Sequence, residues 1–187
     1  MSNSTRDQFN DLLRSEGLNA GIIPVSNIPN EESRLNEVNR LGILNRDLDQ
    51  EAQYNALTQL AAIITKSQIG LINILGSNIQ QCKTNFGFNV VESTLTEEMP
   101  RENSICQYSL ASPQEPLIIN DLFLDERTKH FKKLEAYENL RFYAGSPLIS
   151  SRGFSIGTLC VIDDKPKKLN MIKLKDLGYL QTKLSIC

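Results

Sequence analysis

Apolar side chains recur at helical spacing near both ends of the domain and form strand-like runs between them. Residues 31–41, 54–64 and 170–186 each carry an apolar stripe with the period of a helix. Glu31 and Glu32 place negative charge at the start of the first stripe, where it favours a helix N-terminus. The pattern predicts two helices before a sheet and one after it.

Two pairs of apolar runs between these stripes have the form of β-hairpins. Residues 69–76 and 79–86 are joined by a turn at Gly-Ser-Asn, residues 76–78. Residues 140–163 read LRFYAGSPLISSRGFSIGTLCVID, with two runs joined by a Ser/Gly turn. A third short strand is expected at 115–122 and one short helix at 102–110. Strands joined by hairpins form antiparallel sheets, so the predicted fold class is α+β, with a central antiparallel sheet. The N- and C-terminal helices should cover one face and the middle segments the other.

Strict alternation along the last strand predicts which of its residues share a face. Ile156, Thr158, Cys160 and Ile162 should point to one side of the sheet, and Gly157, Leu159 and Val161 to the other.

Composition indicates where the domain begins and which classes of partner are not expected. Residues 1–30 contain several Gly, Pro and Asn residues and are expected to be an extension or linker, leaving residues 31–187 as the domain. The formal net charge is -2, which argues against nucleic acid as a partner. The chain has no apolar run of membrane-spanning length and a polar start, so we expect no membrane association and a cytoplasmic location.

The cysteines and the single histidine give no pattern of a metal or catalytic site. The four cysteines, at positions 82, 106, 160 and 187, form no C-x-x-C pair, and His130 lies in a charged stretch where it should be solvated. No phosphate loop, nucleophile elbow or zinc-protease motif occurs. We therefore predict no metal, no cofactor and no catalytic residue, with the cysteines as reduced thiols.

Five motifs in a fixed order resemble one family over about residues 34 to 180. They are RLNEVNRLGIL, IGLINILG, RENSICQYSL, PLIINDLFLDER and the hairpin from RFYAG to GTLCVID. In this order they resemble GAF domains, the small-molecule-sensing modules of bacterial signalling proteins. The third motif departs from the family pattern at Gln107 and Tyr108, where Ala-His is common.

This resemblance implies a PAS-like fold and a regulatory role. A GAF sensor binds a small molecule or a protein partner and relays a signal to an output domain of the histidine kinase or diguanylate cyclase type. That output domain would lie outside this chain, and a homodimer through the terminal helices is expected. Two alternatives remain: a thiol enzyme similar to free methionine sulfoxide reductase, and a dimerisation module with no ligand.

Four residues are the candidate ligand contacts: Cys106, Tyr108, Arg141 and Tyr143. Cys106 and Tyr108 lie in the divergent motif, and Arg141 and Tyr143 begin the final hairpin. Two of them also have a structural interpretation. Cys106 would be a small buried side chain, and Arg141 would form an ion pair with Asp121 or Asp125. Tyr143 alternates with Phe142, so one of the two should face the pocket side.

Overall fold

The computed structural model describes residues 25, 27–46, 52–87, 98–129, 139–170 and 175–179. Helices α2 (Glu31–Leu41) and α3 (Ala52–Thr65) flank the short 3-10 helix η1 (Ile43–Asn45). The strands are β1 (Ile69–Leu75), β2 (Ile79–Phe86), β3 (Glu98–Pro100), β4 (Leu117–Ile119), β5 (Phe142–Ile149) and β6 (Ser155–Asp163). Two further 3-10 helices, η2 (Arg101–Asn103) and η3 (Ile105–Leu110), follow β3, and residues 175–179 are helical.

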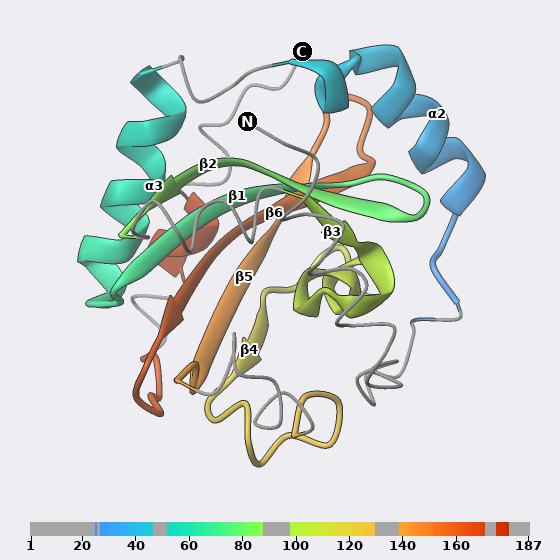
Figure 1. The fold of residues 1–187 in the computed structure, drawn as a ribbon. Coiled ribbons are helices and arrows are strands. Elements are labelled where there is room, and N and C mark those ends of the chain that lie inside the picture. Colours follow the sequence, from blue (N-terminus) through green and yellow to red (C-terminus); the bar gives the residue numbers. More distant parts are fainter. Residues whose placement is uncertain are drawn as a thin grey trace, which may run out of the picture.

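The strands form one antiparallel sheet in the order β3-β2-β1-β6-β5-β4, which confirms the predicted α+β fold. Both predicted hairpins are present, and β1 pairs with β6 to join them at the centre (Figure 1). The sequence interpretation missed β3. This strand has three residues, too few for a recognisable alternation, and its Pro100 fits an edge position.

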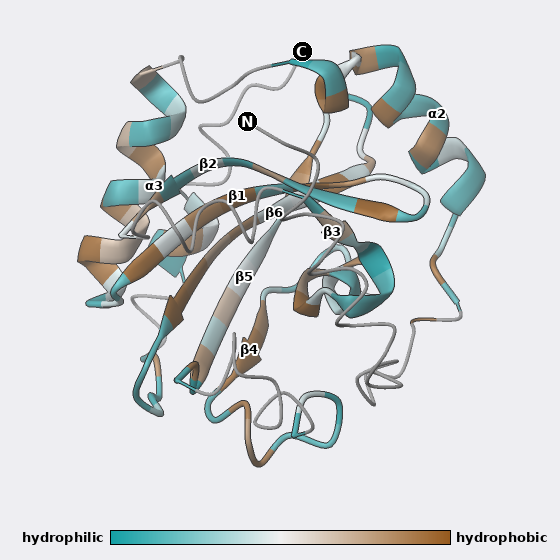
Figure 2. Cartoon of the chain, in the orientation of Figure 1, coloured by the Kyte–Doolittle hydropathy of each residue, from teal (hydrophilic) through white to brown (hydrophobic). Residues whose placement is uncertain are grey.

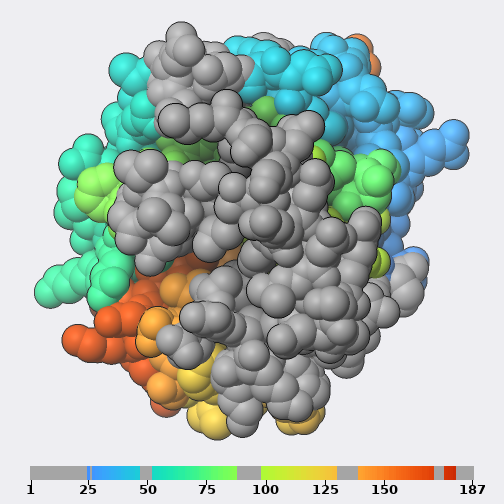
Figure 3. Space-filling view, viewed as in Figure 1, coloured from blue at the N-terminus to red at the C-terminus, as the bar shows by residue number. Residues whose placement is uncertain are grey.

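Helices from both ends of the domain pack on one face of the sheet, as predicted. Leu177, in the C-terminal helical segment, packs in the same core as side chains of α2 and α3. Hydrophobic and polar residues alternate along these two helices (Figure 2). In the space-filling view, α3 and α2 lie on opposite sides of the upper rim (Figure 3). The resulting core, called the helix-side core, contains Val38, Leu41, Ile43, Tyr54, Ala61, Ile72, Ile74, Phe142, Ala144, Leu148, Ile156, Leu159, Val161 and Leu177.

The opposite face is covered by η3 and the segment after β4. Its core, called the η3-side core, contains Ile69, Leu71, Leu75, Ile105, Cys106, Leu110, Ile119, Leu122, Tyr143, Cys160 and Ile162. Phe142 and Tyr143 therefore lie on opposite faces, with Tyr143 on the η3 side.

The predicted alternation along β6 is right for most of the strand and wrong at Ile156. Cys160 packs on the η3 side and Leu159 on the helix side, as expected. Ile156 packs in the same core as Leu159, because the ladder with β5 shifts register between Leu148 and Ile149. The shift gives β6 one extra residue, a β-bulge that reverses the alternation before it.

The predicted single helix at 102–110 is wrong, because Ser104 divides it. Ser104 has extended backbone angles, and its hydroxyl accepts a hydrogen bond from the backbone N–H of Cys106 at 3.0 Å. A serine that caps the next helical turn in this way ends the helix before it. The result is two separate 3-10 helices, η2 and η3.

Several expectations concern residues outside the described part of the chain. They include the solvated position expected for His130 and most of the extension expected at residues 1–30. The boundary at residue 30 stays a prediction. Among the described residues, the structure contains no helix long and apolar enough to span a bilayer.

Candidate functional site

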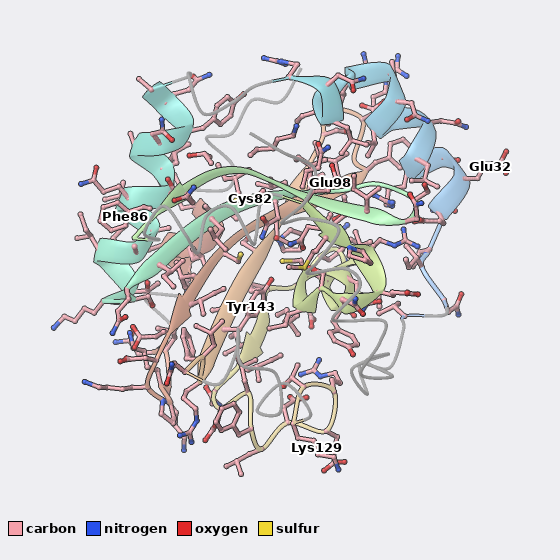
Figure 4. All side chains as sticks on the ribbon, in the orientation of Figure 1. Glu32, Cys82, Phe86, Glu98, Lys129 and Tyr143 are labelled. Carbon is pink, nitrogen blue, oxygen red and sulfur yellow. The ribbon has the colours of Figure 1, made fainter. Side chains whose placement is uncertain are left out.

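Five polar or sulfur-containing side chains meet beneath η3, and we call them the thiol cluster. Asn73 comes from β1, Tyr143 from β5, Thr158 and Cys160 from β6, and Cys106 from η3. None is more than 3% exposed. Tyr143 lies near the middle of the sheet in Figure 4. The cluster thus gathers buried side chains from four separate elements at one point.

Hydrogen bonds within the cluster converge on Cys106. The Asn73 Nδ2 donates to Cys106 Sγ at 3.4 Å and to Cys160 Sγ at 3.5 Å, and the Tyr143 hydroxyl donates to Cys106 Sγ at 3.3 Å. Among the described residues, Asn73 Oδ1 and Thr158 Oγ1 have no hydrogen-bond partner. The Thr158 hydroxyl lies beside both thiols without the geometry of a hydrogen bond. A buried polar atom left unpaired costs about 1–3 kcal/mol, so these two atoms favour a bound polar group.

The same contacts separate the pKa values of the two thiols. Burial raises the pKa of Cys106, but the polar side chains around it, Cys160, Thr158, Tyr143 and Asn73, outweigh burial and lower it. Hydrogen bonding to Cys106, together with burial, raises the pKa of Cys160 well above its ordinary value. Burial also raises the pKa of Tyr143. The directions of the two shifts favour Cys106 over Cys160 as the thiol that loses its proton first.

Local backbone contacts place the Cys106 side chain. Its N–H is capped by Ser104, and its carbonyl oxygen accepts a 2.5 Å hydrogen bond from the Ser109 hydroxyl. Gly145 leaves room for the Tyr143 ring, because a Cβ at Gly145 would lie 2.4 Å from the Tyr143 hydroxyl oxygen. The glycine of the RFYAG motif therefore serves to seat the tyrosine.

The structure brings two of the four predicted site residues together. Cys106 and Tyr143 are in direct contact within the cluster. Arg141 forms a two-point ion pair with Asp121, at 2.9 and 2.6 Å, and lies 4.7 Å from the centre of the Phe123 ring. This is one of the two ion pairs that the sequence suggested.

Tyr108 is half-buried, and its hydroxyl donates to the carbonyl oxygen of Arg127 at 3.3 Å. Like Arg141, it therefore helps to hold the segment that follows β4. The assignment of all four residues as ligand contacts stays a prediction.

The sequence interpretation missed Asn73 and Thr158 and treated Cys160 as core packing. One signal was present. Asn73 is a polar residue in the middle of the apolar run IGLINILG, and a polar side chain at a buried strand position needs a partner.

A second set of contacts, which we call the Glu31 network, joins η2 to helix α2. Arg101 Nη1 donates to Glu31 Oε1 at 2.5 Å and to the carbonyl oxygen of Gly76 at 2.9 Å. Glu31 also accepts two hydrogen bonds from the buried Arg34, which donates to the carbonyl oxygens of Leu75 at 2.7 Å and of Gly76 at 3.2 Å. Burial raises the pKa of Glu31, but the two arginines outweigh it and lower that pKa. The segment that carries Cys106 is thus tied to α2.

Comparison with known proteins shows which proteins this chain resembles. A cyclic di-GMP phosphodiesterase of Pseudomonas aeruginosa is 29% identical over 137 residues, which are 73% of this chain but 22% of that protein. The chain therefore spans about a fifth of that relative's length.

Solved structures with the same fold come from proteins of different kinds. The GAF domain of an Acinetobacter phosphoenolpyruvate-protein phosphotransferase has a TM-score of 0.59 at 15% identity, covering 82% of this chain and 89% of that one. The type II free methionine-R-sulfoxide reductase of Thermoplasma acidophilum has a TM-score of 0.56 at 13% identity, covering 70% and 85%. The blue-light-absorbing form of the Thermosynechococcus elongatus PixJ GAF domain has a TM-score of 0.54 at 14% identity, covering 71% and 80%. At these identities the likeness concerns the fold alone.

The family model of the GAF domain matches residues 49–180, well over half of the chain. This match, the sheet order and the helices on one face agree with one another. The chain belongs to the GAF domain family.

Proposed function

We propose that this domain is a regulatory sensor that binds a small molecule on the η3 side of the sheet. Binding would change the position of α2 and pass a signal to an output domain of the histidine kinase or diguanylate cyclase type, outside this chain. The proposal requires a ligand with different affinities for two arrangements of the domain. It treats the domain as a non-enzymatic module.

The observation that carries the proposal is the Glu31 network. Arg101 sits on the segment that covers the ligand side, while Glu31 begins the helix that lies on the other side of the sheet. Both side chains are largely buried, at 19% and 27% exposed, so solvent screens their attraction less than at a surface pair. A displacement of η2 would therefore act directly on the first turn of α2.

The unpaired atoms of the thiol cluster support the ligand part. Asn73 Oδ1 requires a donor, and the Thr158 hydroxyl can give or accept a hydrogen bond. A ligand that offers a donor next to an acceptor would satisfy both. Cys106 and Tyr143 would line the same point.

The experiment combines a thermal-shift panel with hydrogen exchange. The panel contains cyclic AMP, cyclic GMP, free amino acids and 2-oxo acids, and at least one compound should raise the melting temperature. Hydrogen exchange of α2 with that compound should change in the native chain and in Lys129→Gln, a control that removes an exposed ion pair with Glu126. In Arg101→Gln the compound should still bind while the change in α2 is lost.

Two results would contradict the proposal in separable ways. If no compound stabilises the domain, the ligand part fails and a scaffold without a ligand remains. If α2 responds equally in Arg101→Gln, the route through the Glu31 network is wrong.

We also propose that the domain forms a homodimer through its flanking helices. Leu60 and Ile63 lie three residues apart on α3 and are 41% and 59% exposed, so they form an apolar pair on one helix face that a partner helix would cover. Light scattering should give twice the mass of the chain, and the Leu60→Glu, Ile63→Glu double variant should give the monomer mass. A monomeric native chain would refute the dimer.

A second candidate function, a thiol reductase that acts on a small oxidised substrate, is favoured by the donors around Cys106. These contacts stabilise the thiolate, which is the nucleophilic form. The test is consumption of dithiothreitol in the presence of free methionine sulfoxide, which Cys106→Ser should abolish. A native chain without turnover ends this candidate.

A further inference from the structure

Cys106 and Cys160 form a buried pair of thiols, and the proposed ligand binding does not require the second of them. Both sulfurs contact the same atom, Asn73 Nδ2, at 3.4 and 3.5 Å, and each thiol shifts the pKa of the other. Both are free cysteines in this structure. We propose that this pair is a peroxide-responsive site, in which hydrogen peroxide oxidises Cys106 and Cys160 to a reversible disulfide.

Cys106 is the thiol that reacts first. It accepts hydrogen bonds from both Asn73 and Tyr143, whereas Cys160 accepts one from Asn73 alone. Donors directed at a sulfur stabilise its thiolate, and the thiolate is the form that attacks. The directions of the two pKa shifts agree with this order, because that of Cys106 is lowered and that of Cys160 is raised.

The reaction balances in two steps. In the first, the Cys106 thiolate attacks one oxygen of hydrogen peroxide, the O–O bond breaks, and hydroxide leaves as Cys106 becomes a sulfenic acid. The hydroxide takes up a proton to form water. In the second, the sulfur of Cys160 attacks the sulfenic sulfur, the S–O bond breaks, and a second water leaves with the thiol proton. The two thiols lose two electrons in total, and the peroxide gains them.

Burial selects the oxidant. Cys106 is 3% exposed and Cys160 is fully buried, so a molecule the size of water can reach the pair more readily than a bulky disulfide such as oxidised glutathione. Cys82 on β2 is only partly buried and gives a built-in comparison. A reagent that selects by exposure alone should modify Cys82 before it modifies Cys106 or Cys160.

The two cysteines differ in how firmly the fold holds them. Cys160 lies in β6, which pairs with β1 on one side and β5 on the other. Cys106 lies in η3, which belongs to no ladder. Closing the bond would therefore draw η3 toward the sheet. If the proposed function is right, this movement also reaches α2 through Arg101 and Glu31.

The test treats the native chain with hydrogen peroxide or with oxidised glutathione. Free thiols are then blocked with N-ethylmaleimide in denaturant, and the linked peptides are mapped by mass spectrometry. Peroxide should give one peptide that joins Cys106 to Cys160, with a loss of two hydrogens, and dithiothreitol should reverse it. Oxidised glutathione should leave the pair free. Cys82→Ser should behave like the native chain.

Two variants separate the chemistry from folding defects. Cys160→Ser should stop at a sulfenic acid on Cys106, trapped by dimedone, provided that circular dichroism shows a native fold. Tyr143→Phe keeps both thiols but removes one donor, so it should oxidise on the order of tenfold more slowly while giving the same product.

Several outcomes overturn the inference. They are a pair that stays alkylatable after peroxide, oxidation at Cys82 in preference to the pair, and equal reaction with oxidised glutathione. Hydrogen exchange of α2 in the oxidised and reduced forms tests the last step separately. An unchanged α2 removes the link to the proposed signal and leaves the disulfide standing.

Discussion

Replacing Gly145 by alanine places a methyl group where the ring of Tyr143 now lies. The added Cβ would sit 2.4 Å from the tyrosine hydroxyl oxygen, 2.9 Å from Cζ and 3.0 Å from Cε1. Tyr143 is 1% exposed, so its ring cannot turn away without disturbing the η3-side core. Gly145→Ala should therefore behave as an overpacking substitution.

The size of the effect follows from the atoms involved. Overpacking of a filled core costs about 1–3 kcal/mol of unfolding free energy. Tyr143→Phe alone should cost about 0.5–1.5 kcal/mol, because it removes the hydrogen bond to Cys106. In the double variant the closest atom, the hydroxyl oxygen, is absent, and the next contact lies at 2.9 Å. The double variant should therefore lose about 1 kcal/mol less unfolding free energy than the sum of the losses in the two single variants.

The assay is urea unfolding of the four proteins in this cycle, followed by circular dichroism. Gly178→Ala is the matched control, since a Cβ at this helical glycine meets nothing within 4 Å. The control should be neutral or more stable, by up to about 1 kcal/mol. If the two effects in the cycle add to within about 0.5 kcal/mol, the proposed contact between Gly145 and the tyrosine hydroxyl is refuted.

Two further predictions concern charged side chains of α2. Arg34→Met should lower the unfolding free energy by about 3–5 kcal/mol, because it removes one of the two arginine partners of Glu31 and takes a donor away from the buried carbonyl oxygen of Leu75. Lys129→Met, at an exposed pair, should change it by less than about 1 kcal/mol. Equal effects in urea unfolding would contradict this. Hydrogen bonding from Arg40 lowers the pKa of Glu37 from 4.5 to about 2. A carboxyl whose pKa is lower in the folded state stabilises the fold above its unfolded pKa, so stability should fall as the pH drops from 4.5 toward 2. Glu37→Gln should weaken this dependence, and an identical pH profile for this variant would exclude Glu37 as a source.

The sequence predicts those parts of the fold whose signal is local. The helices at 31–41 and 52–65 and both hairpins follow from periodicity and turn residues within each segment. The packing of Ile156 on the helix side of the sheet does not follow from periodicity, because it depends on a bulge in the pairing between β5 and β6. Strand β3 is recognisable only once its partner β2 is in place.

The candidate site is harder to predict because its members come from four separate elements. Cys106 and Tyr143 could be proposed from their motifs, but their contact depends on how η3 lies over the sheet. Cys160 has the pattern of an ordinary core residue on a strand, and only its neighbour Cys106 gives it a chemical role. Asn73 carries the one local signal, a polar side chain within a wholly buried strand.

The two proposals act on the same segment and should move it in opposite directions. Residues 101–106 hold Arg101 at one end and Cys106 at the other, with Ser104 fixed between them by hydrogen bonds to the Cys106 N–H and to the Gln80 side chain. A ligand placed against the thiol cluster occupies space between η3 and the sheet, whereas a disulfide draws Cys106 closer to β6. Since Arg101 contacts Glu31 through this short segment, ligand and oxidation should change the protection of α2 with opposite sign. Oxidation should then weaken ligand binding by the same factor by which the ligand shifts the thiol–disulfide equilibrium of the pair toward the dithiol, because coupling between two sites in one domain is reciprocal at equilibrium.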